Sequence, residues 1–217
     1  MQENMNMNFD ESIVIHTAEM EWLGSPSEGV LRKPLEREGT ESGRATSLVK
    51  FMPGAAFSPH NHPLGEEILV LEGVFSDETG DFPAGTYFRN PPGLKHQPFS
   101  KEGCILFVKL DQFDPLDLEP VKIQTDFNPV NQGLGGLKVM GLHQFGSESC
   151  ALVFWPAGEH FQPHTHWGGE EILVLTGELI DENGHYPKGT WLRSPHLSKH
   201  YPYVEQDTLI WVKTGHL

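Results

Sequence analysis

The chain has 217 residues, and its 15 basic and 30 acidic side chains give a formal net charge of −15. This acidic balance makes nucleic acid and anionic membrane surfaces poor partners. With 37% hydrophobic and 21% charged residues the composition is that of a globular protein, and the length allows one large domain or two small ones.

The first residues, MQENMNMNFDE, lack the basic and apolar regions of a secretory signal. The longest aliphatic runs, such as Ile68–Leu71 and Ile172–Leu175, are far shorter than the ~20 residues of a membrane span. Cys104 and Cys150 are too few for a disulfide framework. We therefore expect a soluble protein in a reducing, cytoplasmic location.

The chain is an internal repeat. Residues 54–109 align with residues 158–213 without a gap, with 26 identities in 56 positions. Upstream, Ile15-His16-Thr17 resembles Ile123-Gln124-Thr125. Each copy is about 100 residues long, a common domain size. The acidic, Pro-containing segment Asp111–Pro120 predicts a linker, so we expect two domains, residues 1–112 and 113–217.

Within each copy the local signals predict strands rather than helices. Short β-branched or aromatic runs are bounded by Gly and Pro, and no helical pattern exceeds about two turns. In chain order these runs are Ile68–Leu71, Ile105–Lys109, Ala151–Trp155 and Leu209–Lys213. The sequences DETG at Asp77–Gly80 and DENG at Asp181–Gly184 predict turns between strands. We expect an all-β protein of two tandem barrels of the jelly-roll type.

Histidine supplies the candidate chemistry. A His-x-His pair on a strand places both imidazoles on one face, because side chains alternate with period two. A Glu four residues later and a His on a returning strand can close the group, and three neutral imidazoles with one carboxylate suit Zn, Fe, Mn or Ni. The candidate metal ligands are His60, His62, Glu66 and His96 in the first copy and His164, His166, Glu170 and His200 in the second.

The spacing also resembles a known family. Gly54-x5-His-x-His-x3-Glu-x6-Gly73, followed by Gly85-x5-Pro-x-Gly-x2-His96, resembles the two signature boxes of the cupin superfamily. The phrases ATSLVKFMPG, GEEILVLEG and FSDETGDFPAGTYFRNPPG resemble the cupin domain of ChrR-like anti-sigma factors. The resemblance implies two tandem cupin double-stranded β-helix barrels. It places one metal ion on each set of four ligands, zinc being typical of the ChrR-like branch and Fe, Mn or Ni the alternatives.

Two departures from the family pattern limit which family properties can be assigned to this chain. Leu197 replaces the second-box glycine that stands at Gly93 in the first copy, so the turn before His200 is expected to be strained or of another type. The residues before Gly54 align with the second copy, and no Cys precedes Cys104. These residues offer no sigma-binding module with its own Cys/His zinc site, so sigma-factor binding is not inferred.

The resemblance leaves two functions open. One is a ChrR-like sensor or regulatory protein that responds to a small-molecule ligand or oxidant at its metal ions. The other is an Fe(II)-dependent dioxygenase acting on a small diketone or hydroxyketone, and the sequence does not decide whether the chain is an enzyme. It assigns no catalytic residue and no organic cofactor. Because cupins often pair by strand addition, a homodimer is a further expectation.

One pair of polar positions lies next to the ligand carboxylates. Glu67 and Glu171 alternate away from Glu66 and Glu170, so we expect them to pair with Arg89 and Arg193 or to face solvent. A role for either arginine in binding a substrate anion is the less favoured reading.

Overall fold

The computed structural model describes residues 4–39, 43–93 and 95–217. Contacts divide the chain into two compact units. The N-terminal unit consists of Met1–Met7 and Glu21–Asp126, and the C-terminal unit consists of Asn8–Met20 and Phe127–Leu217. Among the described residues the only helical element is the one-turn 3-10 helix η1, Thr17–Glu19. The all-β character expected from the sequence is thus confirmed.

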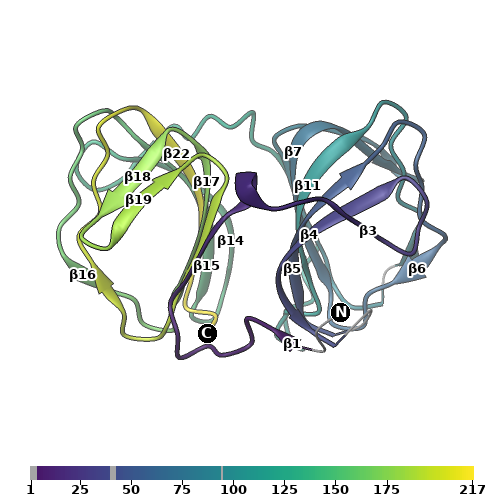
Figure 1. Ribbon diagram of the computed structural model, residues 1–217, viewed down its shortest axis with the longest axis horizontal. Helices are drawn as coiled ribbons and strands as arrows, with labels where there is room; N and C mark the ends of the chain where they lie inside the picture. The colour runs from purple at the N-terminus through teal and green to yellow at the C-terminus, as the bar shows by residue number, and fades with distance from the viewer. Residues whose placement is uncertain (1–3, 40–42, 94) are drawn as a thin grey trace. The chain divides into compact units, whose positions relative to one another are not determined.

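The N-terminal unit is built from one large curved sheet and one two-stranded ribbon (Figure 1). The large sheet runs in the order β1-β4-β5-β11-β7-β9-β12, with β3 paired to β4 and β8 to β7, and the ribbon is β10-β6. The strands are β1 (Asn4–Met5), β3 (Leu23–Gly24), β4 (Val30–Glu38), β5 (Ala45–Phe51), β6 (His60–Asn61), β7 (Glu66–Asp77), β8 (Gly80–Pro83), β9 (Thr86–Asn90), β10 (Lys95–His96), β11 (Cys104–Leu110) and β12 (Val121–Gln124).

The C-terminal unit repeats this plan. Its large sheet runs β13-β14-β15-β22-β17-β20-β2, with two ribbons, β16-β21 and β18-β19. Its strands are β2 (Ile13–His16), β13 (Asn131–Gln132), β14 (Lys138–Phe145), β15 (Glu148–Trp155), β16 (His164–Thr165), β17 (Glu170–Thr176), β18 (Glu178–Asp181), β19 (Gly184–Pro187), β20 (Thr190–Ser194), β21 (Lys199–His200) and β22 (Thr208–Thr214). The predicted turns join β7 to β8 and β18 to β19, where Asp77 faces Gly80 and Asp181 faces Gly184.

Each barrel encloses its own apolar core. Alternate residues of neighbouring strands point inward, as the period of a strand requires. In the N-terminal unit the buried core includes Val49, Phe51, Ile68, Val70, Phe75, Phe88 and Leu106. In the C-terminal unit it includes Val153, Trp155, Ile172, Val174, Leu192 and Ile210. Burial of a large aliphatic or aromatic side chain contributes about 1.5–3 kcal/mol, so these clusters are the main source of stability in each barrel.

Two corresponding strands do not follow the boundary between residues 112 and 113 that the repeat suggested: each pairs with the unit on the other side of it. β2, near the start of the chain, pairs with β20 of the C-terminal unit, and β12 pairs with β9 of the N-terminal unit. His16 faces Thr190 in one ladder and Gln124 faces Thr86 in the other. The similarity between residues 15–17 and 123–125 therefore marks the same edge strand in both barrels. Each of these strands adds to a sheet edge by backbone hydrogen bonds, β12 along β9 and β2 along β20.

A buried ion-pair cluster lies on the face of the N-terminal sheet opposite the metal ligands. Arg89 donates to Glu67 at 3.1 Å and to Asp117 at 2.6 Å, and the Tyr87 hydroxyl donates to Glu67 at 2.9 Å. The guanidinium carbon lies 3.8 Å from the centre of the Phe113 ring. The predicted pairing of Glu67 with Arg89 is confirmed. The segment predicted as a linker supplies Asp117 and Phe113 and so closes this cluster.

The corresponding cluster of the C-terminal unit includes further partners of its own. Glu171 accepts a hydrogen bond from the Trp191 indole at 2.7 Å and lies 3.1 Å from Nε2 of His216. Arg193 donates to the carbonyl of Asn8 at 2.8 Å, and its guanidinium carbon lies 4.3 Å from the centre of the Phe9 ring. The segment that carries β2 therefore supports Arg193 as the linker segment supports Arg89.

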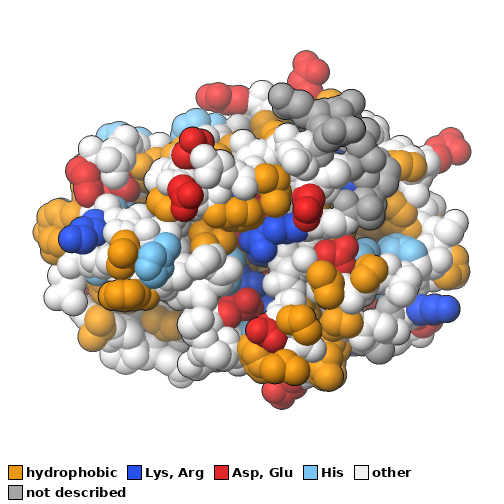
Figure 2. All heavy atoms as spheres, turned by 90° about the horizontal axis from the view of Figure 1, so that it is seen from below, with side chains coloured by type: hydrophobic (Ala, Val, Ile, Leu, Met, Phe, Trp, Pro, Cys, Tyr) orange, Lys and Arg blue, Asp and Glu red, His pale blue; other side chains and the backbone are white. Residues whose placement is uncertain are grey.

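The surface, the helix lengths and the cysteines add three simple findings. Acidic side chains are spread over the face shown in Figure 2, where Lys and Arg do not form a broad continuous patch. Within residues 4–39, 43–93 and 95–217, no helix has the length and apolar character of a membrane span. Both cysteines are buried and unbridged.

Candidate metal centres

The ribbon of β6 and β10 assembles the candidate site of the N-terminal barrel. His60 lies directly opposite His96 in this antiparallel pair, and His62 follows two residues after His60. Glu66 begins β7, so its buried side chain enters the same space from the large sheet. The His-x-His spacing places two rings, the returning strand brings the third and the long strand β7 provides the carboxylate.

The four side chains converge. The ring centres of His60, His62 and His96 are 4.9–5.7 Å apart, and one nitrogen from each ring lies within 4.8 Å of the others. Oε1 of Glu66 is 3.3 Å from Nε2 of His62, and Oε2 is 3.4 Å from Nε2 of His96. Asn90 donates to Oε2 at 3.3 Å and orients the carboxylate. All four residues predicted for the first copy are thus brought together.

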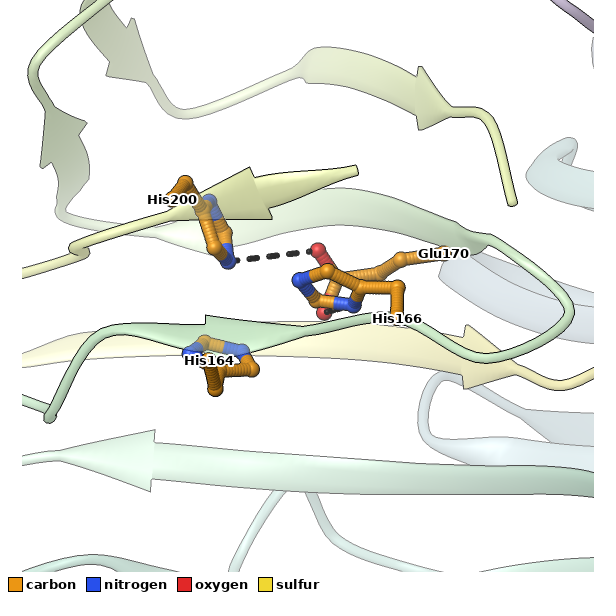
Figure 3. Close-up of side chains that lie close together, drawn as sticks. All are labelled: His164, His166, Glu170 and His200. Carbon is orange, nitrogen blue, oxygen red and sulfur yellow. Dashed lines mark ion pairs between the residues drawn. The ribbon is translucent and has the colours of Figure 1, made fainter. Parts of the chain in front are cut away.

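The C-terminal barrel repeats the arrangement with β16 and β21. His164 lies opposite His200, and the three ring centres are 4.5–4.8 Å apart. Oε1 of Glu170 is 3.3 Å from Nδ1 of His166, and Oε2 is 3.5 Å from Nε2 of His200. Figure 3 shows the carboxylate of Glu170 pointing between the two rings. One ligand atom from each of the four residues lies within 4.8 Å of the others.

Outer hydrogen bonds fix the orientation of three rings. Nδ1 of His60 lies 2.8 Å from the carbonyl of Ser58, and Nδ1 of His164 lies 3.1 Å from the carbonyl of Gln162. Because a carbonyl only accepts, each of these Nδ1 atoms carries the proton and each Nε2 is left as a lone-pair donor. Nδ1 of His200 makes the equivalent contact with Asp181 at 3.2 Å.

The interior nitrogens fit a bound cation. Nε2 of His62, His96, His166 and His200 is buried, and among the described residues none of these four atoms has a hydrogen-bond partner. Buried polar atoms are nearly always satisfied, and Nε2 of His62, His96 and His200 has a carboxylate oxygen at 3.3–3.5 Å without forming a hydrogen bond to it, an arrangement that a shared cation would satisfy. Imidazole nitrogen with one carboxylate is a donor set for Zn, Fe, Mn or Ni. The residues present therefore suit the metal that the sequence implied.

The protonation states in the metal-free protein follow from burial. Burial raises the pKa of Glu66 to about 8 and that of Glu170 to about 7. Burial, together with the neighbouring imidazoles, lowers the pKa of His62 and of His166 to about 3. For His200 burial acts to lower the pKa, but the hydrogen bond to Asp181 and the charge of Glu170 raise it overall. At neutral pH Glu66 is therefore largely protonated and His62 and His166 are neutral, whereas Glu170 titrates near this pH beside His200, whose pKa is raised.

Metal binding should consequently release protons. Loading both sites with Zn²⁺ at pH 6.5 is expected to release about two to three protons per chain, because this pH lies below both raised carboxyl pKa values and His200, whose pKa is also raised, must lose its proton to bind the ion. Raising the pH to 9 should tighten binding and abolish the release. Calorimetric titration in buffers of different ionisation enthalpy measures the number. Glu66→Gln should lower the number of protons released by about one. A titration with no proton release at pH 6.5 would contradict the raised carboxyl pKa values.

The turn before His200 keeps its shape in spite of Leu197. Leu197 has φ 64° where Gly93 has φ 93°, and its amide donates to the carbonyl of His166 at 2.8 Å. The left-handed conformation predicted to be strained is thus adopted by a leucine that is 47% exposed. The hydrogen bond to His166 connects this turn directly to the segment that carries His164 and His166.

This strain gives a stability prediction. Leu197→Gly is expected to stabilise the C-terminal unit by about 0.5–1 kcal/mol, because the relief of a left-handed non-glycine residue exceeds the entropic cost of glycine. Gly93→Leu should destabilise the N-terminal unit by a similar or larger amount. Thermal unfolding of the two variants checks both. A Leu197→Gly protein that unfolds at a lower temperature than the wild type would rule out strain at this turn.

The two sites differ beyond their ligands. Asp181 supports His200, whereas Nδ1 of His96 is buried without a hydrogen-bond partner among the described residues. A cavity of about 750 Å³ in the N-terminal barrel is lined by His60, His62 and Glu66 and by a mostly apolar wall. A second cavity, of about 400 Å³, is lined by His62, Glu66 and His96. The N-terminal ligand set is therefore open to space on two sides.

Sequence reasoning missed several supporting residues. Asn90 and Asp181 lie far from the ligands along the chain and reach them only through the pairing of β7 with β9 and the β18-β19 ribbon. Arg32 and Arg37, on β4, line the large cavity. No spacing rule connects these residues with the His-x-His boxes. His160 stacks on Tyr203, with ring centres 5.0 Å apart.

Comparisons with known proteins agree with this geometry. The family model of the ChrR cupin-like domain matches residues 10–114 and again residues 120–217. A candidate dioxygenase from Nostoc punctiforme superposes with a TM-score of 0.78 at 14% identity, over 96% of this chain and 84% of that chain. A deletion variant of the Bacillus subtilis oxalate decarboxylase has a TM-score of 0.64 at 14% identity, over 93% of this chain and 76% of that chain.

A third structure spans most of both chains. AerE from Microcystis aeruginosa superposes with a TM-score of 0.64 at 17% identity, over 89% of this chain and 95% of that chain. A comparison with curated protein sequences gives no match. At these identities the structural likeness concerns the fold alone.

Proposed function

The chain belongs to the family of ChrR cupin-like domains, with two copies in tandem, and from this we propose that each of its barrels binds one divalent metal ion. The observation that carries the proposal is the convergence, in both barrels, of buried imidazole nitrogens on a buried carboxylate, with nitrogens that make no hydrogen bond within the part of the chain that the structure describes. We propose zinc as the resident ion, with Fe, Mn or Ni as alternatives that suit the same donor set.

We further propose that the protein is a sensor or regulatory protein, and that a small molecule or oxidant acts at the N-terminal ion. A bound divalent cation would supply a Lewis acid and an exchangeable coordination position. The chain's own part is to present three imidazoles, with the His60 ring held in one tautomer by the Ser58 carbonyl, to hold the Glu66 carboxylate through Asn90, and to provide a mostly apolar chamber that excludes bulk water. The ligand's access to the ion through this chamber supports the assignment to the N-terminal barrel.

A second candidate function is an Fe(II)-dependent dioxygenase acting on a small diketone or hydroxyketone. It is favoured by the 750 Å³ chamber beside the ligands, which has room for an organic substrate. The likeness in fold to a candidate dioxygenase adds support. In this reading the chamber wall positions the substrate and the buried ligands exclude water from the reacting centre.

Loading the protein separately with zinc and with iron distinguishes the two. The sensor proposal predicts that ligands bind to the zinc form without oxygen consumption and that the iron form gives no steady-state turnover of diketones. The dioxygenase proposal predicts oxygen uptake by the iron form that His62→Ala abolishes. Sustained oxygen-dependent turnover would overturn the sensor proposal, and its absence from the iron-loaded protein over a panel of diketones and hydroxyketones would overturn the second.

A further inference from the structure

One buried carboxylate lies directly behind a candidate ligand of the C-terminal site. Oδ2 of Asp181 is 3.2 Å from Nδ1 of His200, and the two side chains are 5% and 12% exposed. Because a carboxylate only accepts, the neutral ring carries its proton on Nδ1 and its lone pair on Nε2. This Nε2 lies 3.5 Å from Oε2 of Glu170, within the group drawn in Figure 3. Asp181 therefore selects the tautomer of His200 that a metal ion requires.

The other oxygen of Asp181 is fixed by three donors. Oδ1 accepts from the amide of Asn183 at 2.7 Å, from the amide of Gly184 at 3.1 Å and from the hydroxyl of Tyr186 at 2.8 Å. With Oδ1 engaged in this way, Oδ2 is the oxygen that is left for His200. The ring of Tyr186 belongs to the buried core of the C-terminal barrel, so the carboxylate is held against a rigid part of the fold.

The N-terminal site has the same hairpin without this contact. Asp77 is the repeat counterpart of the C-terminal aspartate, and its Oδ1 accepts from the amide and from the hydroxyl of Thr79, each at 2.6 Å. Phe82 takes the place of Tyr186 and has no hydroxyl to hold the carboxylate. Nδ1 of His96 is buried and makes no hydrogen bond within residues 4–39, 43–93 and 95–217. The third imidazole of this set thus lacks the support that its counterpart has.

A second difference concerns the ligand carboxylates. Asn90 donates to Oε2 of Glu66 at 3.3 Å, and Ser194 stands at the corresponding place in the C-terminal barrel. A donor to the ligand carboxylate draws negative charge away from a cation, whereas a carboxylate behind an imidazole adds negative charge toward it. Both differences therefore favour tighter cation binding by the C-terminal site.

The C-terminal ligands also lie closer together. The three ring centres are 4.5–4.8 Å apart there and 4.9–5.7 Å apart in the N-terminal site. In the C-terminal site the ligand atoms within 4.8 Å of one another include an oxygen of Glu170. In the N-terminal site, among the described residues, they come from the three histidines alone. The C-terminal ligands therefore need less rearrangement to bind a cation.

We propose that Asp181 is a positioning residue for His200, and that it makes the C-terminal site the tighter and more slowly exchanging of the two metal sites. This inference rests on the proposed metal sites. A carboxylate behind a ligating imidazole fixes the ring and raises its basicity, and the loss of such a partner costs about 10–100-fold in metal affinity. The N-terminal ion is then the exchangeable one, in the barrel whose chamber adjoins the ligands.

Each site is measured by itself in the whole chain with the other site disabled. His62→Ala leaves the C-terminal ligand set, and His166→Ala leaves the N-terminal one. Competition with a chelator should give a zinc dissociation constant about tenfold or more lower for His62→Ala than for His166→Ala. Asp181→Asn, added to His62→Ala, should weaken zinc binding by about 10–100-fold. Asp77→Asn, added to His166→Ala, is the matched control and should change zinc binding far less, because Asp77 bonds to Thr79.

The tautomer of His200 provides a readout that a loss of stability would not change. Because three donors hold Oδ1 of Asp181, the amide oxygen of Asp181→Asn should keep that place and the amide nitrogen should face His200. An amide nitrogen only donates, so the ring must then carry its proton on Nε2, the atom that faces the ion. Nitrogen chemical shifts of the neutral ring in the metal-free protein should show the Nδ1–H form in His62→Ala and the Nε2–H form once Asp181→Asn is added.

The outcomes separate the positioning role from the metal sites themselves. The role is overturned, and the metal sites stand, if the N-terminal site binds zinc as tightly as the C-terminal site or more tightly. The same holds if Asp181→Asn costs no more affinity than Asp77→Asn, or if His200 carries its proton on Nε2 in the His62→Ala chain. If neither single-site chain binds zinc, the proposed function fails. The affinity order and the tautomer in His62→Ala do not require the Asp181 variant to fold.

Discussion

Arg89→Met is expected to destabilise the N-terminal unit by about 3–5 kcal/mol, the range observed when one partner of a buried ion pair is removed. Arg89, Glu67 and Asp117 are each at most 2% exposed. Without the guanidinium, the two carboxylates would lose the cation that lies between them in a nearly dry environment. A loss of this size is a large part of the stability of a single domain.

Urea denaturation of the wild type and the variant measures this effect. Arg89→Lys provides the matched control, because lysine keeps the positive charge but lacks the planar guanidinium that donates to Glu67 and Asp117 at the same time. The free energy of unfolding of Arg89→Lys should lie between those of the wild type and Arg89→Met. If Arg89→Met unfolds within about 1 kcal/mol of the wild type, the buried cluster does not stabilise the barrel as described.

His62→Ala should lower the metal content from two ions per chain to one. The substitution removes one of four ligands from the N-terminal site and leaves the C-terminal ligand set intact. His166→Ala should give the complementary loss. Because bound metal stabilises the folded state by mass action, each variant should also lose the thermal stabilisation that its own site provides.

Elemental analysis and thermal unfolding of the same samples report both effects. His185→Ala is a suitable control, since its side chain is 67% exposed and lies outside both ligand sets. It should retain two ions. A His62→Ala protein that keeps two ions, or loses both, would show that the two sites are not independent centres of four ligands.

The features predicted from the sequence are those that local spacing determines. The two hairpin turns and the ligand boxes follow from residues near one another in the chain, and the internal repeat follows from the similarity of two segments of the sequence. His60 and His62 converge because strand side chains alternate, and His96 joins them through one short ribbon. The strained turn at Leu197 was also foreseeable, since a leucine stands where its repeat partner has a left-handed glycine.

The features that escaped prediction depend on pairing between distant strands. Nothing near β2 in the sequence indicates that it joins β20, almost 180 residues later, because the hydrogen bonds of an edge strand carry little side-chain information. Asp117 becomes a partner of Arg89 only once its segment folds against the sheet. Arg32 and Arg37 share a face only because of a bulge, which reverses the alternation that a sequence reading assumes.

The central claim is that each barrel holds one divalent cation through three imidazoles and one carboxylate. Elemental analysis of protein purified without added metal, expressed as atoms per chain, tests it most directly. Two tightly held transition-metal ions per chain are expected, zinc favouring the sensor proposal and iron the dioxygenase. Protein that is folded but holds no stoichiometric metal, and that takes up none on addition of zinc, iron, manganese or nickel, would contradict it.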